Sequence, residues 1–105
     1  MDSVLLRAAN IAPFEQVHVW NVTRGTRLVT YALEGEEGSG IVCMNGAAAH
    51  LVVAGDMIIV ATFCELDANE ARTHQPISVF VDTNNRIKQI TPNEVPGPAI
   101  RRSLE

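Results

Sequence analysis

The alternation of apolar and polar residues predicts a chain built mostly of short strands. Val17 and Val19 fall on one face of an alternating segment, and His18 and Trp20 fall on the other. The same alternation, or a short β-branched apolar run, recurs several times between turn signals. Strands are therefore expected at 16–22, 27–34, 41–44, 57–65, 77–82 and 86–91.

Little helix is expected. Residues 2–10 predict a short helix with Asp2 or Ser3 as its N-cap, and a helical turn is expected around 68–71. Residues 47–53 fit a helical turn or a strand equally well. Short strands with close turns and little helix are typical of a small β-barrel or sandwich, and the proline-containing residues 92–105 predict an extended tail.

Length and charge exclude several classes of function. A chain of 105 residues predicts one domain. The net charge of -4 and the lack of a basic stripe argue against a nucleic-acid partner. The apolar runs are too short to cross a bilayer, and no secretion signal opens the sequence, so a cytoplasmic protein is expected.

The cysteines and histidines predict no metal centre. Cys43 and Cys64 lie inside apolar runs, which predicts buried free thiols rather than a disulfide. His18, His50 and His74 lack metal-ligand spacing with one another or with cysteine.

Residues 45–50 form an unusually bare segment. The Asn45-Gly46 pair permits positive φ, and the alanines that follow, Ala47 and Ala48 among them, leave the backbone open to close approach. One interpretation is a binding floor whose N–H groups meet an anion or a carbonyl oxygen. The other is a tight turn whose alanines lie beneath other strands.

Arg27 and Tyr31 are the strongest candidates for chemistry. They lie four residues apart in one predicted strand, so their side chains share a face. A guanidinium beside a phenol fits a carboxylate clamp with an adjacent proton donor. The alternative is an Arg that ends a strand and a Tyr at the rim of a barrel. Trp20 fits either the core or a pocket wall, and Thr30 faces away from Arg27.

Five blocks together resemble the pyruvoyl-dependent aspartate 1-decarboxylases. They are Trp20-Asn21-Val22-Thr23-x-Gly25-x-Arg27-x-x-Thr30-Tyr31, Gly38-Ser39-Gly40, Asn45-Gly46-Ala47-Ala48-Ala49-His50 and Gly55-Asp56, followed by Glu70-Ala71-Arg72. The resemblance covers about residues 2–90. It implies a mainly β fold, a small double-psi β-barrel with one or two short helices over residues 1–91. It also implies a tetramer with active sites between subunits, and a lyase that converts L-aspartate to β-alanine and carbon dioxide for pantothenate biosynthesis.

The resemblance also implies roles for individual residues. Arg27 would bind a substrate carboxylate, Tyr31 would donate the proton that replaces carbon dioxide, and Thr30 would assist self-processing. The residues that would bind the substrate beside Arg27 are Trp20, Asn45, Gly46, Ala47 and Ala48. The family's cofactor, a pyruvoyl group made from its own Gly-Ser bond, would act as the electron sink.

The sequence departs from the family pattern at its start. The cleaved Gly-Ser pair of the family precedes the helix matched by residues 2–10, so we expect no cofactor encoded in this chain and no decarboxylation without an N-terminal segment or a partner that supplies it. Ser3 and Gly38-Ser39 are not expected to replace that pair. Two alternatives stay open: a cofactor-free relative recruited to another reaction, such as cyclisation of a polyketide or polyene, and a non-catalytic binding or regulatory barrel. The expected partners are a small-molecule substrate, further copies of the chain and, for decarboxylation, a separate N-terminal segment; the non-catalytic barrel would instead bind a partner or a full-length decarboxylase.

Overall fold

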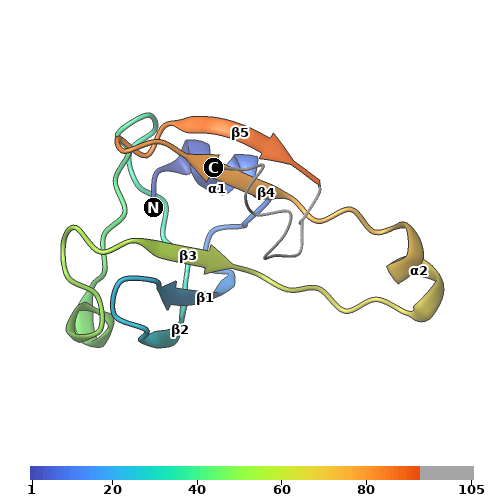
Figure 1. The fold of residues 1–105 in the computed structure, drawn as a ribbon, viewed down its shortest axis with the longest axis horizontal. Coiled ribbons are helices and arrows are strands. Elements are labelled where there is room, and N and C mark those ends of the chain that lie inside the picture. The colour runs from blue at the N-terminus through green and yellow to red at the C-terminus, as the bar shows by residue number, and fades with distance from the viewer. Residues whose placement is uncertain (93–105) are drawn as a thin grey trace. The chain divides into compact units, whose positions relative to one another are not determined.

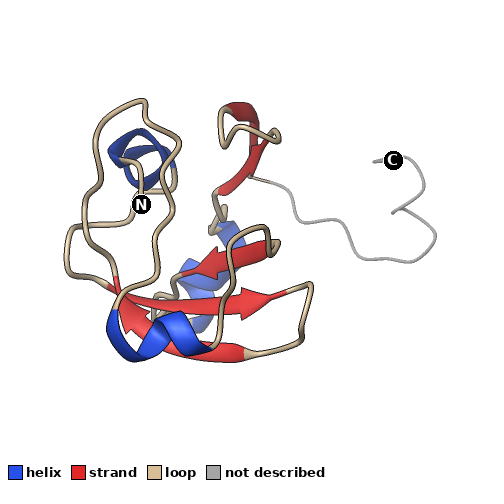
Figure 2. Cartoon of the chain, turned by 90° about the vertical axis from the view of Figure 1, so that its left-hand side faces the viewer, coloured by secondary structure: helices blue, strands red, loops and turns tan. Residues whose placement is uncertain are grey.

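The computed structural model describes residues 1–92 and divides the chain into two compact units, 1–65 and one that begins at Leu66. Each unit is described by itself. The fold is mainly β with short helices, as the sequence predicted, and long loops join the strands (Figures 1 and 2). In chain order the elements are α1 (Ser3–Ala8), β1 (Gln16–Asn21), β2 (Arg27–Tyr31), the 3-10 helix η1 (Gly46–His50), β3 (Ile58–Ala61), α2 (Ala68–Thr73), β4 (Ser78–Val81) and β5 (Ile87–Thr91).

The predicted N-terminal helix is confirmed as α1, with Asp2 as its cap. The Asp2 carboxylate accepts a hydrogen bond of 2.9 Å from the Val4 N–H, which satisfies a free donor of the first turn. Leu5 and Leu6 are buried, at 7% and 2% exposure. The helix therefore fixes the start of the chain and supplies part of the core.

The first unit is organised around a three-stranded antiparallel sheet in the order β2-β1-β3 (Figure 1). The strands predicted at 16–22 and 27–34 are confirmed as the somewhat shorter β1 and β2, which form a hairpin. Trp20 pairs with Arg27 at the turn end, and Gln16 pairs with Tyr31 at the other end. Gly25 has a φ of 77°, so the turn uses backbone space that other residues rarely adopt.

One face of this sheet packs against α1 and forms the core. Val17 and Val19 are 4% and 1% exposed and cluster with Leu6. Partly buried side chains from the flanking strands join the same cluster, namely Leu28, Ile58 and Val60. Because side chains alternate along a strand, the other face of the sheet carries Trp20, Arg27 and Tyr31.

The first two residues are held between segments 33–35 and 40–41. The amine of Met1 donates to the Leu33 carbonyl (2.8 Å), and the Gly35 N–H donates to the Met1 carbonyl (2.7 Å). On the other side the Asp2 N–H donates to the Ile41 carbonyl (2.7 Å). The predicted strand at 41–44 is wrong: this segment contains no regular strand, because only Ile41 finds a backbone partner of this kind.

The second unit contains α2 and the β4-β5 hairpin, which confirm the helical turn and the last two strands predicted from the sequence. Asp67 and Glu70 form a reciprocal capping box at the start of α2. A turn at 82–86 joins β4 to β5, and Asn85 adopts a φ of 57° within it.

Two expectations are corrected. The predicted strand at 57–65 reduces to β3, and Ile59 within β3 and Phe63 after it are 48% and 68% exposed. Cys43 and Cys64 are free thiols, but both are exposed, since the apolar runs around them have an uncovered side.

The strands described in residues 1–92 pair as an open sheet and a hairpin, so a closed barrel over 1–91 stays a prediction. The tail predicted for 92–105 lies outside the described residues beyond Pro92.

Candidate functional site

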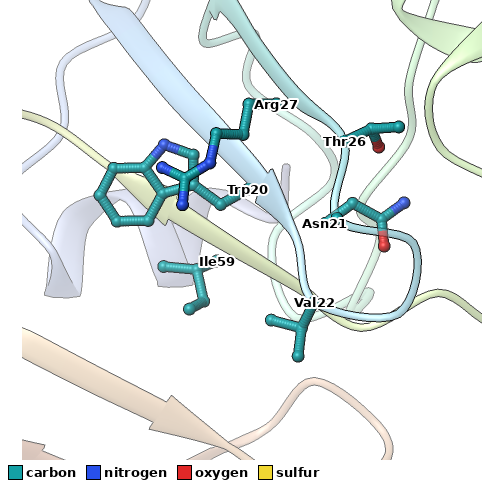
Figure 3. A pocket seen from close by; sticks show the side chains of 7 residues that line it. Trp20, Asn21, Val22, Thr26, Arg27 and Ile59 are labelled. Carbon is teal, nitrogen blue, oxygen red and sulfur yellow. The ribbon is translucent and has the colours of Figure 1, made fainter.

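A pocket of about 280 Å³ lies at the turn end of the β1-β2 hairpin. The described residues that line it are Trp20, Asn21, Val22, Gly25, Thr26, Arg27 and Ile59. The side chains of Trp20, Arg27 and Ile59 gather on one side, whereas those of Asn21 and Thr26 point the other way (Figure 3). The pocket thus combines an apolar wall with one cation.

Arg27 and Trp20 interact directly. The guanidinium carbon lies 5.5 Å from the centre of the indole ring, within the range of a cation–π contact (Figure 3). No carboxylate among residues 1–92 forms an ion pair with Arg27. The guanidinium is exposed and oriented by the indole, so it can accept an anionic ligand without breaking an ion pair to a described residue.

The wall beside Arg27 extends into an aromatic cluster that sequence reasoning missed. The Phe63 ring lies 5.0 Å from the His18 ring and 6.3 Å from the Trp20 ring, in edge-on and tilted arrangements. His18 and Trp20 belong to one face of β1, and Phe63 follows β3. The alternation in 16–22 indicated the two β1 residues, but no local pattern places Phe63 beside them.

Tyr31 lies on the same face of β2 as Arg27 but at the opposite end of the strand. Its side chain is 57% exposed, and it lies outside the lining of the pocket. Thr30 lies on the other face, in register with the buried Val17. The structure therefore brings Trp20 and Arg27 together, places Tyr31 four residues further along, and turns Thr30 toward the core side.

The bare turn is a short 3-10 helix, η1, that begins after Asn45. Gly46 has a φ of 59°, and a Cβ added there would meet nothing within 4 Å. No residue of η1 is buried, so its alanines do not lie beneath other strands. Asn45, Gly46, Ala47 and Ala48 do not line the pocket, but η1 is joined to it at its far end, where the Leu51 carbonyl accepts a 2.8 Å hydrogen bond from the Thr26 hydroxyl.

A polar network behind the pocket is the main feature that sequence reasoning missed. The Asp56 side chain is only 4% exposed, and one of its oxygens accepts hydrogen bonds from the Asn21 amide (2.8 Å), the Arg24 Nε–H (2.8 Å) and the Val53 N–H (2.9 Å). The Val53 N–H, then the Asn21 amide and Arg24, hold the pKa of Asp56 below its ordinary value. The only sequence signal was Gly55-Asp56, which predicted a turn.

Two features are absent from the part of the chain that the structure describes. No three His, Cys, Asp or Glu side chains in residues 1–92 lie close enough together to hold a metal ion. Within the same residues, no helix has the length and apolar character needed to cross a bilayer.

The sequence matches known proteins over most of its length. A family described as "Aspartate decarboxylase" matches residues 1–88. A protein of Myxococcus xanthus named aspartate 1-decarboxylase is 54% identical over 101 residues, which is 96% of this chain and 78% of that protein. Proteins of the same name from Legionella pneumophila (strain Lens) and Rhodopirellula baltica are each 53% identical, over 87% and 92% of this chain and 68% and 62% of their own length.

Proposed function

The chain belongs to the aspartate decarboxylase family, and from this premise we propose that it supplies the substrate-binding and proton-donating residues of an aspartate 1-decarboxylase. In that reaction one carboxylate of L-aspartate leaves as carbon dioxide, a proton takes its place, and β-alanine remains. The requirements are a cation for the carboxylate that stays, a proton donor, and a group that accepts electrons.

The observation that carries the proposal is the register of Met1 beside the end of β2. Met1 bonds to residues 33 and 35, so in parallel pairing it lies across from Glu34. Residues joined ahead of Met1 in the same register would run back along β2, and the third of them would lie across from Tyr31.

The edge of β2 fits such a segment. β2 lies at the edge of its sheet, and Ala32 already exchanges backbone hydrogen bonds with residues 14 and 15. The backbone groups of Tyr31 therefore point away from β1, toward the open edge. A preceding segment would complete the site by adding a strand there.

The residues of this face suit the chemistry that a pyruvoyl group at that position would need. When bound, such a group supplies a carbonyl that accepts the electrons released with carbon dioxide. Arg27, which pairs with no described carboxylate, holds the remaining carboxylate of the substrate. The Tyr31 hydroxyl donates the proton. The two residues are about 13 Å apart along the strand, a span that two long side chains and a four-carbon dicarboxylate fill.

The other residues retain more limited roles. Trp20 orients Arg27 and walls off water on one side of the substrate. Asn45, Gly46, Ala47 and Ala48 stay predicted contacts of the reacting groups, and Thr30 stays a predicted aid to self-processing without a contact to the substrate.

The test compares two proteins: the chain as printed, and the same chain carrying an N-terminal segment with a Gly-Ser pair whose Ser is the third residue before Met1. Intact mass reports cleavage and pyruvoyl formation, and chromatography reports β-alanine made from L-aspartate. We expect the extended protein to be processed and active, and the printed chain to be inactive. A fully processed protein that makes no β-alanine would refute the proposal and favour the cofactor-free or non-catalytic alternative.

A further inference from the structure

We propose that Asp56 is a positioning residue for the pocket: through Asn21 and Arg24 it holds the hairpin turn in place and thereby sets the geometry of Arg27 over Trp20. None of the interactions described for Asp56 is with the Trp20 ring or the Arg27 guanidinium. The inference deepens the proposed function. Of its two tests, the ligand-binding experiment rests on that function, whereas the fluorescence experiment does not depend on any reaction.

The first step is the arrangement of the turn. Residues 22–26 include three lining residues of the pocket, Val22, Gly25 and Thr26. The turn is closed by the Gly25 N–H, which donates to the Asn21 carbonyl at 2.8 Å, and by the Arg24 N–H, which donates to the Asn21 side-chain oxygen at 3.1 Å. Its shape therefore depends on where the Asn21 side chain points.

The second step is what fixes Asn21. Asn21 is buried, at 3% exposure. Its side-chain amide donates hydrogen bonds to both the Asp56 carboxylate (2.8 Å) and the Leu51 carbonyl (3.2 Å). With the oxygen occupied by Arg24, the amide is satisfied at both ends, so it has one preferred orientation. Asp56 is the only charged partner among these contacts.

The third step is how Asp56 links segments far apart in the sequence. The same carboxylate oxygen accepts from Arg24 in the turn and from Val53 in the segment that follows η1. The adjacent Met57 N–H donates to the Thr23 hydroxyl at 2.9 Å. One buried carboxylate thus ties the turn that walls the pocket to the loop that leads from the alanine-rich helix into β3.

Loss of the carboxylate would leave Asn21 and Arg24 without their common acceptor. The turn would gain freedom, and Arg27, which is the first residue of β2 after it, would lose its fixed place over the indole. Asp56 acts on the ligand only through other residues, and substitutions of such residues usually change binding affinity by roughly 2- to 30-fold.

The fluorescence experiment uses Trp20, the single tryptophan of the chain. Acrylamide quenching of its fluorescence is measured in the wild type, Asp56→Asn, Asp56→Ala and the matched control Asp67→Asn. Asp67 also accepts backbone hydrogen bonds, but they come from Asn69 and Glu70 of its own helix. We expect the quenching constant to rise about twofold in Asp56→Ala, less in Asp56→Asn, and not in Asp67→Asn.

The ligand-binding experiment titrates the same proteins, at a temperature where each is folded by circular dichroism, with succinate as a dicarboxylate probe. Weakening of roughly tenfold in Asp56→Asn, with Asp67→Asn unchanged, supports the proposal.

Quenching and affinity both within the error of the wild type in folded Asp56→Ala would overturn it, as would equal effects in Asp67→Asn. If the wild type does not bind succinate while quenching still responds to Asp56, the proposed function loses support and the positioning role stands.

Discussion

In the proposed function, Arg27 is the residue on which substrate binding would most directly depend. Its guanidinium is held over Trp20, and no described carboxylate neutralises it. We predict that Arg27→Ala lowers kcat/KM for L-aspartate by about 10²-fold in the processed enzyme, mostly through KM, because a charge-assisted contact to the carboxylate is lost. Steady-state β-alanine formation checks this, and Arg27→Lys is expected to recover only part of the loss because Lys lacks the planar fork.

A suitable control is Arg72→Ala, because Arg72 lies in α2 and its side chain reaches only Asn69 at 3.4 Å among the interactions described. Equal losses in both variants would mean that net charge, and not the position of Arg27, governs the reaction.

Tyr31 is the proposed proton donor. The phenol is 57% exposed and shares its face with Arg27. Tyr31→Phe keeps the ring and removes the proton donor, so we predict a fall in kcat of about 10²- to 10⁴-fold with KM little changed. If Tyr31→Phe retains the wild-type kcat, Tyr31 is not the proton donor and another group must supply the proton.

The lowered pKa of Asp56 predicts that the fold loses stability at low pH. Hydrogen bonds in the folded protein lower its pKa below 3.8, so folding favours the ionised carboxylate. The stabilisation is complete above pH 3.8 and is lost as the pH falls through the lower, folded pKa. The difference in Tm between wild type and Asp56→Asn should therefore be constant from about pH 5 to 7 and shrink below about pH 4.

Asp67 and Asp82 also have lowered pKa values, through backbone N–H groups of Glu70 and of Arg86 respectively. Both carboxylates titrate in the wild type and in Asp56→Asn alike, so their contributions cancel in the difference in Tm between the two proteins. A difference in Tm that grows on acidification would contradict the assignment.

At the scale of residues, sequence reasoning recovered what lies within one hairpin and missed what spans the chain. Trp20 and Arg27, which the family resemblance assigns to one site, lie side by side in the structure because they are cross-strand neighbours next to a local turn, while their roles stay predictions. Asp56 reaches Asn21 across 35 positions, and Phe63 reaches His18 across a different strand pairing, so neither contact leaves a local pattern. The exposure of Cys43 and Cys64 was missed because an apolar run does not reveal whether anything covers it.

At the scale of elements, the segment around Gly35 packs closely against the start of the chain. A Cβ at Gly35 would lie 2.6 Å from Ile41 Cγ2 and 3.2 Å from the Met1 backbone. We predict that Gly35→Ala destabilises the fold by about 1–3 kcal/mol, measured by urea unfolding, because the added Cβ clashes with Ile41 Cγ2 and crowds the Met1 backbone.

The double variant Gly35→Ala/Ile41→Ala provides the check. Ile41 is 45% exposed, so its own truncation is expected to have a small effect, while it removes the nearest clashing atom. The double variant should be more stable than the sum of the two single changes predicts. If the two stability changes simply add, the clash with Ile41 is not the cause of the destabilisation by Gly35→Ala.

The elements also reveal why some predictions from sequence succeeded. α1, the β1-β2 hairpin and the β4-β5 hairpin each carry their own cap or turn, so local signals sufficed. The strand expected at 41–44 had the right composition but no partner strand among residues 1–92, because its neighbours there are the two residues at the start of the chain. Strand propensity reports suitability for a sheet and cannot supply the pairing.

At the scale of the whole molecule, the open face of the sheet predicts self-association. Ile59 and Phe63 are 48% and 68% exposed beside Trp20, and few apolar side chains are fully buried in the residues described. We expect the chain to sediment as an assembly larger than its 11.4 kDa, and Phe63→Glu to shift it toward the monomer. A wild type that sediments at 11.4 kDa at every concentration would refute this, and a Tm measured in parallel excludes unfolding of the variant.

The anchored amine of Met1 has a practical consequence for anyone who purifies this protein. An affinity handle fused ahead of Met1 would be fed along the exposed rim of β2 and would cover the backbone beside Tyr31. Such a handle would occupy the edge that the proposed N-terminal segment needs, so it should be removed before the chain is compared with the extended protein in an assay.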